Sequence, residues 1–119
     1  MSTLLMIDPD PTSRHSLKLL CHRFGMEFIE ASGLSDGIRL FKERAIDLIV
    51  MDMFLPQKSG LALIAEITSQ DYHPPIIATF SAAQAPKINF KKFTHILGAS
   101  YTFEKPVNVG DIVEVAGKT

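Results

Sequence analysis

The sequence has a single cysteine, Cys21, which excludes an internal disulfide and a cysteine metal cluster. Cys21 falls in an apolar stripe of helical spacing, so we expect a small buried hydrophobic side chain rather than a reactive thiol. The chain also lacks any run of about 20 apolar residues, the length needed to cross a bilayer. A secretory signal has a basic leader followed by a longer apolar run. The first apolar run here, Leu4–Ile7, is short and has no basic leader. We therefore expect a cytoplasmic protein without membrane contact.

An excess of charge of one sign is missing as well. Twelve Lys and Arg oppose thirteen Asp and Glu, which leaves a formal charge of −1 and indicates no direct binding to nucleic acid. No Gly-rich phosphate loop follows the first apolar run, and no Lys-Ser/Thr pair of the nucleotide-binding kind is found. A flavodoxin-like protein that binds a phosphate-containing cofactor is therefore the function that this sequence supports least. With 119 residues, 46% of them hydrophobic and 21% charged, residues 1–119 are predicted to form one globular domain, and an origin in a longer protein stays open.

Short apolar runs alternate with segments of helical period, the pattern of an α/β fold with a parallel sheet. The predicted strands are residues 4–7, 27–30, 47–51, 76–80 and 102–103. Asp10 and Pro11 resemble an N-cap and a first helical position. The apolar positions of the first four predicted helices are Leu17, Leu20, Cys21 and Phe24; Leu34, Ile38, Phe41 and Ala45; Leu63, Ile64 and Ile67; Phe90, Phe93, Ile96 and Leu97. Asn108 is predicted to cap a last helix, which makes five βα units.

Polar residues stand where four of the predicted strands end. Asp8 follows the first strand and Asp52 the third, while Ser81 follows the fourth and Lys105 comes just after the fifth. In open parallel sheets functional groups gather at the carboxyl ends of the strands. Any one of these residues is most simply an ordinary polar strand end, but together the four offer two carboxylates, a hydroxyl and an ammonium at one edge.

Such a set suits phosphoryl transfer to a carboxylate, which depends on positioning and on neutralising charge. Asp52 is the candidate nucleophile, because a carboxylate can form an aspartyl phosphate. Asp8 would help to hold Mg²⁺, a hard ion that takes one or two carboxylates. Lys105 would pair with the phosphoryl group, and the Ser81 hydroxyl would hydrogen-bond to it. Thr79 competes with Ser81 for this last role, because strand alternation puts both on one face.

Two segments resemble the signatures of the response-regulator receiver family. Residues 47–56 with Gly60 are similar to the phosphoacceptor strand and loop, and Gly98-Ala99 followed by Lys105-Pro106 is similar to the second signature. The resemblance implies a flavodoxin-like (βα)5 three-layer sandwich with strand order 2-1-3-4-5. It also implies a Mg²⁺ site formed by Asp8, Asp52 and the backbone carbonyl of Phe54, and a cis bond before Pro106.

The resemblance further implies a signalling switch of a two-component phosphorelay rather than an enzyme. The phosphoryl donor would be a histidine kinase or a phosphotransfer protein. The signal would pass to a downstream protein or output domain through the face formed by the fourth helix, fifth strand and fifth helix. The sequence does not decide whether the protein forms a homodimer.

The sequence departs from the family at two positions. Receivers carry two adjacent acids after the first strand, but here Asp8 is followed by Pro9, which has no side-chain ligand. Asp10 could substitute for the lost carboxylate, but it precedes Pro11, and this position favours a helix-capping role instead. We therefore expect weakened Mg²⁺ affinity. Thr102 stands where the family has an aromatic switch residue. The alternative interpretation is a pseudo-receiver that acts as a phosphorylation-independent interaction module.

Overall fold

The computed structural model describes residues 2–53, 60–81, 98–105 and 109–117. In chain order, its elements are β1 (Thr3–Ile7), α1 (Pro11–Arg23), β2 (Glu27–Ala31), α2 (Leu34–Glu43), β3 (Leu48–Asp52), α3 (Gly60–Thr68), β4 (Ile76–Phe80), β5 (Tyr101–Glu104) and α5 (Val109–Gly117). The predicted fourth helix, with its apolar positions between Phe90 and Leu97, and the cap Asn108 lie outside the described residues. None of the helices in the described segments is long and apolar enough to cross a bilayer.

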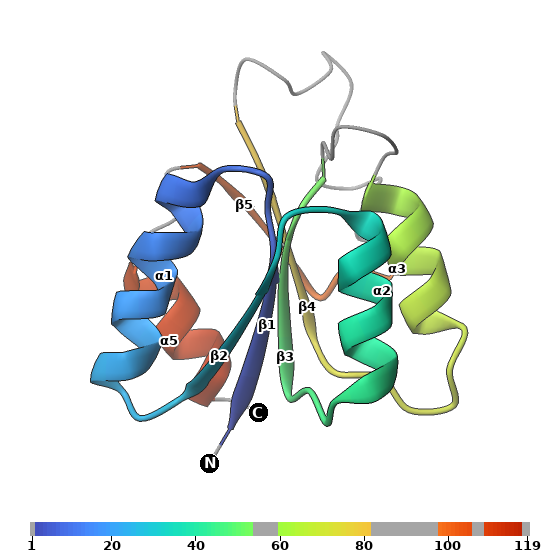
Figure 1. Ribbon diagram of the computed structural model, residues 1–119, viewed down its shortest axis with the longest axis horizontal. Coiled ribbons are helices and arrows are strands. Elements are labelled where there is room, and N and C mark those ends of the chain that lie inside the picture. Colours follow the sequence, from blue (N-terminus) through green and yellow to red (C-terminus); the bar gives the residue numbers. More distant parts are fainter. Residues whose placement is uncertain (1, 54–59, 82–97, 106–108, 118–119) are drawn as a thin grey trace.

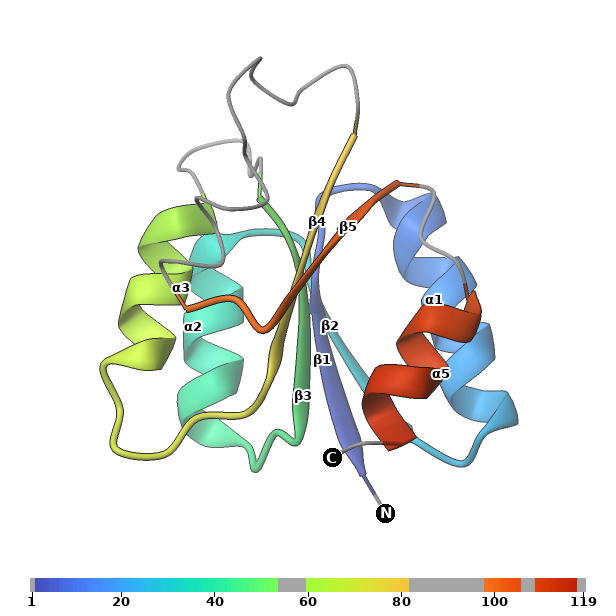
Figure 2. The same cartoon turned by 180° about the vertical axis from the view of Figure 1, so that it is seen from behind.

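The five strands form one parallel sheet in the order β2-β1-β3-β4-β5. Helices α1 and α5 cover one face of this sheet, and α2 and α3 cover the other (Figures 1 and 2). Helices lie on both faces because β2 and β3 lie on opposite sides of β1, and a right-handed crossover places its helix on opposite faces for opposite directions of travel across the sheet. The predicted fold class and strand order are confirmed.

The three inner strands are buried along their whole length, as their unbroken apolar runs require. Alternate side chains of these strands enter two separate cores. The core beneath α2 and α3 includes Leu5, Ile7, Ile49, Met51, Ile64 and Ile67. The core beneath α1 and α5 includes Leu4, Met6, Leu17, Leu20, Val50 and Ile112. The rigid inner strands therefore fix the positions of the residues that follow them.

Helix α1 begins as the sequence predicts but ends one residue earlier than its apolar spacing suggests. Asp10 is the N-cap and Pro11 the first helical residue, as predicted. Cys21 is buried, and burial raises the pKa of its thiol to about 11, so it is an inert core residue. Phe24 was expected on the same buried face, but it is 54% exposed. The prediction fails there because the helix ends at Arg23 and Gly25, with φ +70°, turns the chain away.

Helix α2 contains a glycine, Gly37, that faces Ile7 of β1 at close range. A Cβ on Gly37 would lie 2.7 Å from Cδ1 of Ile7, so a larger residue there would force the buried Ile7 side chain or the helix to shift. Ala45 was expected on the apolar face of this helix, but it is exposed and lies beyond Glu43, where α2 ends. Ile46 is the buried residue of this segment.

Candidate functional site

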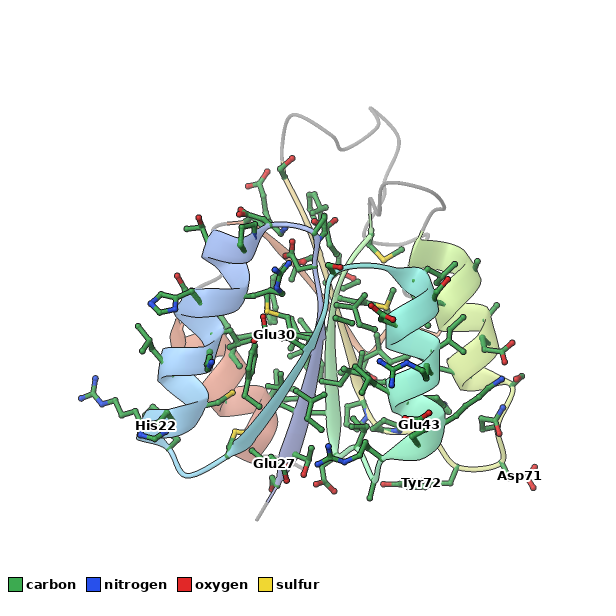
Figure 3. All side chains as sticks on the ribbon, in the orientation of Figure 1. His22, Glu27, Glu30, Glu43, Asp71 and Tyr72 are labelled. Atoms are coloured by element: carbon green, nitrogen blue, oxygen red, sulfur yellow. The ribbon has the colours of Figure 1, made fainter. Side chains whose placement is uncertain are left out.

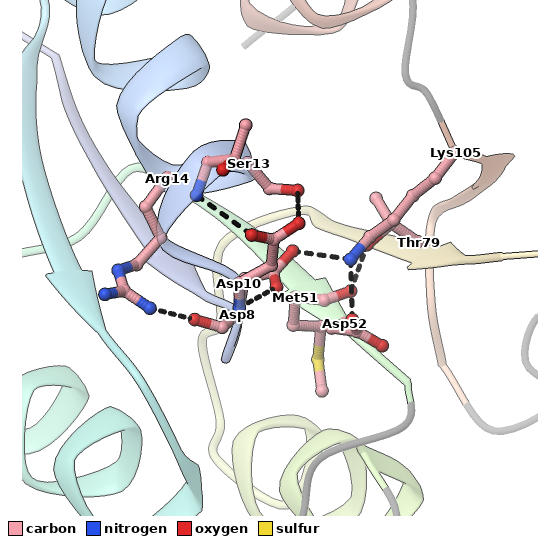
Figure 4. A network of polar contacts seen from close by, with 9 residues as sticks. Asp8, Asp10, Ser13, Arg14, Met51, Asp52, Thr79 and Lys105 are labelled. Carbon is pink, nitrogen blue, oxygen red and sulfur yellow. Dashed lines mark hydrogen bonds and ion pairs between the residues drawn. The ribbon is translucent and has the colours of Figure 1, made fainter.

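Three of the four predicted site residues converge at the carboxyl edge of the sheet. Lys105 follows β5, and its Nζ donates to Oδ2 of Asp8 at 2.7 Å and to Oδ2 of Asp52 at 2.6 Å (Figure 4). Asp8 follows β1, and Asp52 is the last residue of β3. Strands β1 and β3 are neighbours, so the topology itself brings the two carboxylates together.

The cluster is buried and carries a net negative charge. The side chains of Asp8 and Asp52 are 0% and 4% exposed, and that of Lys105 is 19% exposed. Burial raises the pKa of Asp8, although the hydrogen bond from Lys105 opposes the shift. Burial alone would lower the pKa of Lys105, but the bonds to Asp52 and Asp8 outweigh it and raise that pKa above its ordinary value. Two carboxylates around one ammonium leave a charge of −1.

The turn after β1 is held by Arg14, a residue that the sequence analysis missed. Its Nη1 donates to the backbone oxygen of Asp8 at 2.7 Å, and its Nε pairs with Oε1 of Glu30 at 2.9 Å. The backbone N–H of Asp10 also donates to Oδ1 of Asp8 at 2.8 Å. The only sequence signal for Arg14 is its place in the first turn of α1, three residues after Pro11. Together these bonds fix the orientation of the Asp8 carboxylate.

The carboxylate of Asp10 is engaged by the start of α1. Its Oδ1 accepts from the Thr12 backbone N–H at 2.9 Å, and its Oδ2 accepts from the Ser13 hydroxyl at 3.1 Å. The bond from Thr12 lowers the pKa of this carboxyl, as expected for an N-cap. The predicted capping role of Asp10 is confirmed.

The two candidate hydroxyls have different surroundings. Thr79 is buried, pairs in register with Asp52, and donates its hydroxyl to the backbone oxygen of Met51 at 3.2 Å. Ser81 is half-buried and comes directly after β4, at the carboxyl edge. Because the Thr79 hydroxyl is engaged within the sheet, Ser81 stays our prediction for the phosphoryl-facing hydroxyl.

The aromatic residues of β5 lie on one face of the strand. The rings of Tyr101 and Phe103 stack with centroids 6.3 Å apart and planes at 13°, and both pack against the core beneath α1 and α5. Thr102 lies between them and faces the other side of the sheet. Tyr101 therefore cannot stand in for the missing aromatic at Thr102.

The carboxylates of Asp8 and Asp52 fit a magnesium ion, although they give it only a small number of protein ligands. Asp8 and Asp52 already share one cation, the ammonium of Lys105, which shows that their oxygens converge. Mg²⁺ accepts one or two carboxylates and keeps several waters. Within the described part of the chain, no three His, Cys, Asp or Glu side chains form a metal-binding group, and Pro9 adds none. The predicted carbonyl ligand, Phe54, and Pro106 lie outside the described residues.

Apart from the Arg14–Glu30 pair, the other ion pairs of the described segments join exposed side chains. Glu27 pairs with Arg44, and Glu43 pairs with Arg39. The residues labelled in Figure 3 that lie nearest the amino end of the sheet include Glu27, Asp71 and Tyr72. The exposed Glu27–Arg44 and Glu43–Arg39 pairs contribute little to stability. The buried cluster around Lys105 differs from them in this respect.

Comparison with known proteins agrees with this geometry. A family model described as "Response regulator receiver domain" matches residues 4–116. Protein PilH of Pseudomonas aeruginosa is 25% identical over 111 residues, which are 91% of this chain and 88% of PilH. The transcriptional regulatory protein AfsQ1 of Streptomyces coelicolor is 35% identical over 79 residues, 66% of this chain but 35% of AfsQ1, so the chain matches only about a third of that protein.

Solved structures agree as well. A response regulator receiver domain protein from Clostridium thermocellum superposes with a TM-score of 0.88 at 26% identity, and the match covers 99% of this chain and 93% of that one. Fold, strand order and family match therefore point the same way. The chain belongs to the response regulator receiver domain family, the receiver modules of two-component signalling.

Proposed function

We propose that this receiver is phosphorylated on Asp52 and acts as a switch in a two-component phosphorelay. The observation that supports the proposal best is the bridge from Lys105 Nζ to Asp8 and Asp52 at 2.7 and 2.6 Å. It supplies an acceptor carboxylate, a second carboxylate for a cation, and a positive charge for the phosphoryl oxygens. Phosphoryl transfer needs little more than such positioning and charge neutralisation.

The chain's own residues have separate tasks in this proposal. A carboxylate oxygen of Asp52 attacks phosphorus, and the bond from phosphorus to the donor atom breaks. Lys105 moves its ammonium to a phosphoryl oxygen, and the Ser81 hydroxyl donates to another. When bound, Mg²⁺ supplies further positive charge to the phosphoryl oxygens, and Asp8, Asp52 and the Phe54 carbonyl would hold it. Asp52 is only 3% exposed, and its Oδ2 is bonded to the Lys105 ammonium, so in this proposal the ammonium shifts from the carboxylate toward the incoming phosphoryl group.

The proposed partners follow from the family. A histidine kinase or phosphotransfer protein would donate the phosphoryl group in the cytoplasm. A downstream protein or output domain would receive the signal through the fourth helix, β5 and α5. AfsQ1 and the KdpE regulator of Escherichia coli, of which the match covers 35% and 48%, are named as transcriptional regulatory proteins. An output domain that binds DNA is therefore the partner class we propose first.

The test is phosphoryl uptake from a small donor. The protein is incubated with Mg²⁺ and acetyl phosphate, and intact mass is measured. We expect one added phosphoryl group, and none in Asp52→Asn. Asp36→Asn, which changes a carboxylate that is 61% exposed on α2, is the matched control and should be phosphorylated normally. Absence of the adduct in the unaltered protein with acetyl phosphate and with kinase donors would refute the proposal.

A pseudo-receiver is the second candidate, because Pro9 supplies no ligand and Asp10 is engaged as a cap. A Mg²⁺ titration separates the two functions. For a working receiver we expect weak but measurable binding that Asp8→Ala abolishes. Pro9→Asp restores the missing carboxylate and should tighten binding about tenfold, since ligand charge sets affinity at such sites. If only Pro9→Asp binds Mg²⁺ and accepts phosphate, the pseudo-receiver is the better description.

A further inference from the structure

A cavity of about 370 Å³ lies beside the carboxylate cluster, on the sheet face that α1 and α5 cover. Its volume is within the range of small-molecule sites, roughly 300–1,000 Å³. It does not touch Asp52, but Asp8, Thr79 and Lys105 form one part of its wall. The acceptor site and the cavity therefore share two charged residues while remaining distinct spaces.

The remaining wall is divided by chemistry. Apolar side chains from two strands and two helices line one part: Met6, Leu17, Leu20, Val50 and Ile112. Hydroxyls from the first half of α1 line another: Thr12, Ser13 and Ser16. Ser16 is exposed whereas Leu17 and Leu20 are buried, so the hydroxyls stand toward solvent and the apolar residues lie inside. A complementary ligand has an apolar body and a polar end.

The charges at the shared wall select the polar end. The ammonium of Lys105 is already bonded to both carboxylates, and the three groups together carry −1. An anionic head group would meet this negative charge, and among the described lining residues Lys105 is the one Lys or Arg, already bonded to both carboxylates. A cationic head group would compete with Lys105 for Asp8, whose Oδ1 also accepts from the Asp10 backbone N–H. An uncharged hydroxyl meets neither obstacle and can exchange hydrogen bonds with the serine and threonine hydroxyls.

We propose that this cavity binds a small uncharged amphipathic molecule of the phenol or alcohol class. Its apolar body lies against Leu17, Leu20 and Ile112, and its hydroxyl lies at the polar wall beside Lys105. The consequence for signalling rests on the phosphorylation proposed above. An occupant packed against Lys105 holds the ammonium in its bridge between the two carboxylates, and so slows phosphoryl uptake by Asp52.

Binding is measured first, on the unphosphorylated protein without Mg²⁺, so that its result does not depend on phosphorylation. The probe is 4-propylphenol, and the backbone amides of Leu17, Thr79 and Ile112 are followed by NMR. A molecule of about ten non-hydrogen atoms should bind with a Kd on the order of 1 mM. 4-Propylbenzoate, which has the same body and a negative head group, should bind at least about tenfold more weakly.

Two pairs of variants on α1 locate the probe. Leu20→Phe fills the apolar part, and Leu19→Phe adds the same ring at a neighbour that is 59% exposed and not part of the wall. Ser16→Phe obstructs the solvent side without altering the core, and His15→Phe is its exposed control. We expect at least tenfold weaker binding in Leu20→Phe and Ser16→Phe, with both controls unchanged. Equal binding by all four variants, or no shift of the three amides in the unaltered protein, would overturn the proposed site.

The regulatory step has its own measurement. Saturating 4-propylphenol should slow the appearance of the phosphoryl adduct at least twofold in the unaltered protein, and have no effect in Ser16→Phe. Binding without any change in this rate would leave the ligand site standing but refute its link to Lys105. If no adduct forms at all, the proposed function fails while the NMR result still decides the cavity.

Discussion

Replacing Lys105 by methionine tests whether the ammonium is the main stabilising charge of the site. Breaking a buried ion pair by removing one partner costs about 3–5 kcal/mol, because a buried charge is left without compensation. Here Lys105→Met leaves two carboxylates, with side chains 0% and 4% exposed. The Lys105 side chain is 19% exposed, so water can partly replace it. We therefore expect the free energy of unfolding at pH 7 to fall by about 2–3 kcal/mol.

The loss should depend on pH with a definite sign. Burial already raises the pKa of Asp8, and removing the ammonium raises it further. The folded variant then binds a proton that the unfolded chain, with an ordinary Asp pKa of 3.8, has released. Stability falls with rising pH wherever the folded state binds more protons. The penalty should thus be smallest near pH 4 and grow as the pH rises above it. In the unaltered protein the raised pKa of Lys105 keeps its contribution intact until the pH exceeds about 10.5.

Urea unfolding followed by far-UV circular dichroism measures both effects, since the chain has no tryptophan. Lys42→Met is the matched control, because Lys42 is 59% exposed in a surface pair with Glu66 and should change stability by less than about 0.5 kcal/mol. The double variant Asp8→Asn/Lys105→Met should regain about 1 kcal/mol or more. A loss below about 0.5 kcal/mol for Lys105→Met, or one that does not shrink toward pH 4, would refute the reasoning.

Three further results are expected. Gly37→Ala should lower the free energy of unfolding by about 1 kcal/mol despite alanine's better helix propensity, because the new Cβ would lie 2.7 Å from Ile7; a stabilised variant in urea unfolding would contradict the close packing. Arg14→Met should cost about 1–2 kcal/mol by the same assay, since the Asp8 backbone oxygen loses a charged donor; an unchanged midpoint would contradict this. Cys21, with a pKa of about 11, should resist iodoacetamide at pH 7.5 in the folded state and react in urea; rapid labelling of the folded protein would show that it is not buried.

The fold was predictable because its signals are local and mutually consistent. Apolar runs at the three inner strands, such as Leu48–Met51, can be read directly from the sequence. The convergence of Asp8, Asp52 and Lys105 was predictable for a related reason, since parallel strands deliver their final residues to one edge. The predicted ends of the helices were less accurate. Phe24 and Ala45 continue the apolar spacing of α1 and α2, but these helices end before them, at Arg23 and Glu43.

The parts that could not be predicted depend on long-range packing. Arg14 bonds to a backbone oxygen and to a side chain of β2, and neither partner leaves a pattern in the sequence around it. The cavity depends on how far α1 and α5 stand from the sheet, which no local period encodes. The roles of Asp52, Ser81 and Lys105 in phosphorylation stay predictions until the labelling experiment is done.

The bridge at Lys105 joins the first and the last strand of the chain in sequence order. Its two partners lie 97 and 53 residues away along the chain, so the bridge can form only once these long intervening segments have been brought together, at a cost in chain entropy. The two carboxylates are therefore without their counter-charge until β5 has joined the sheet. Under the proposed function, a nascent or partly unfolded copy in which β5 has not joined the sheet would lack the completed acceptor site and would not be phosphorylated.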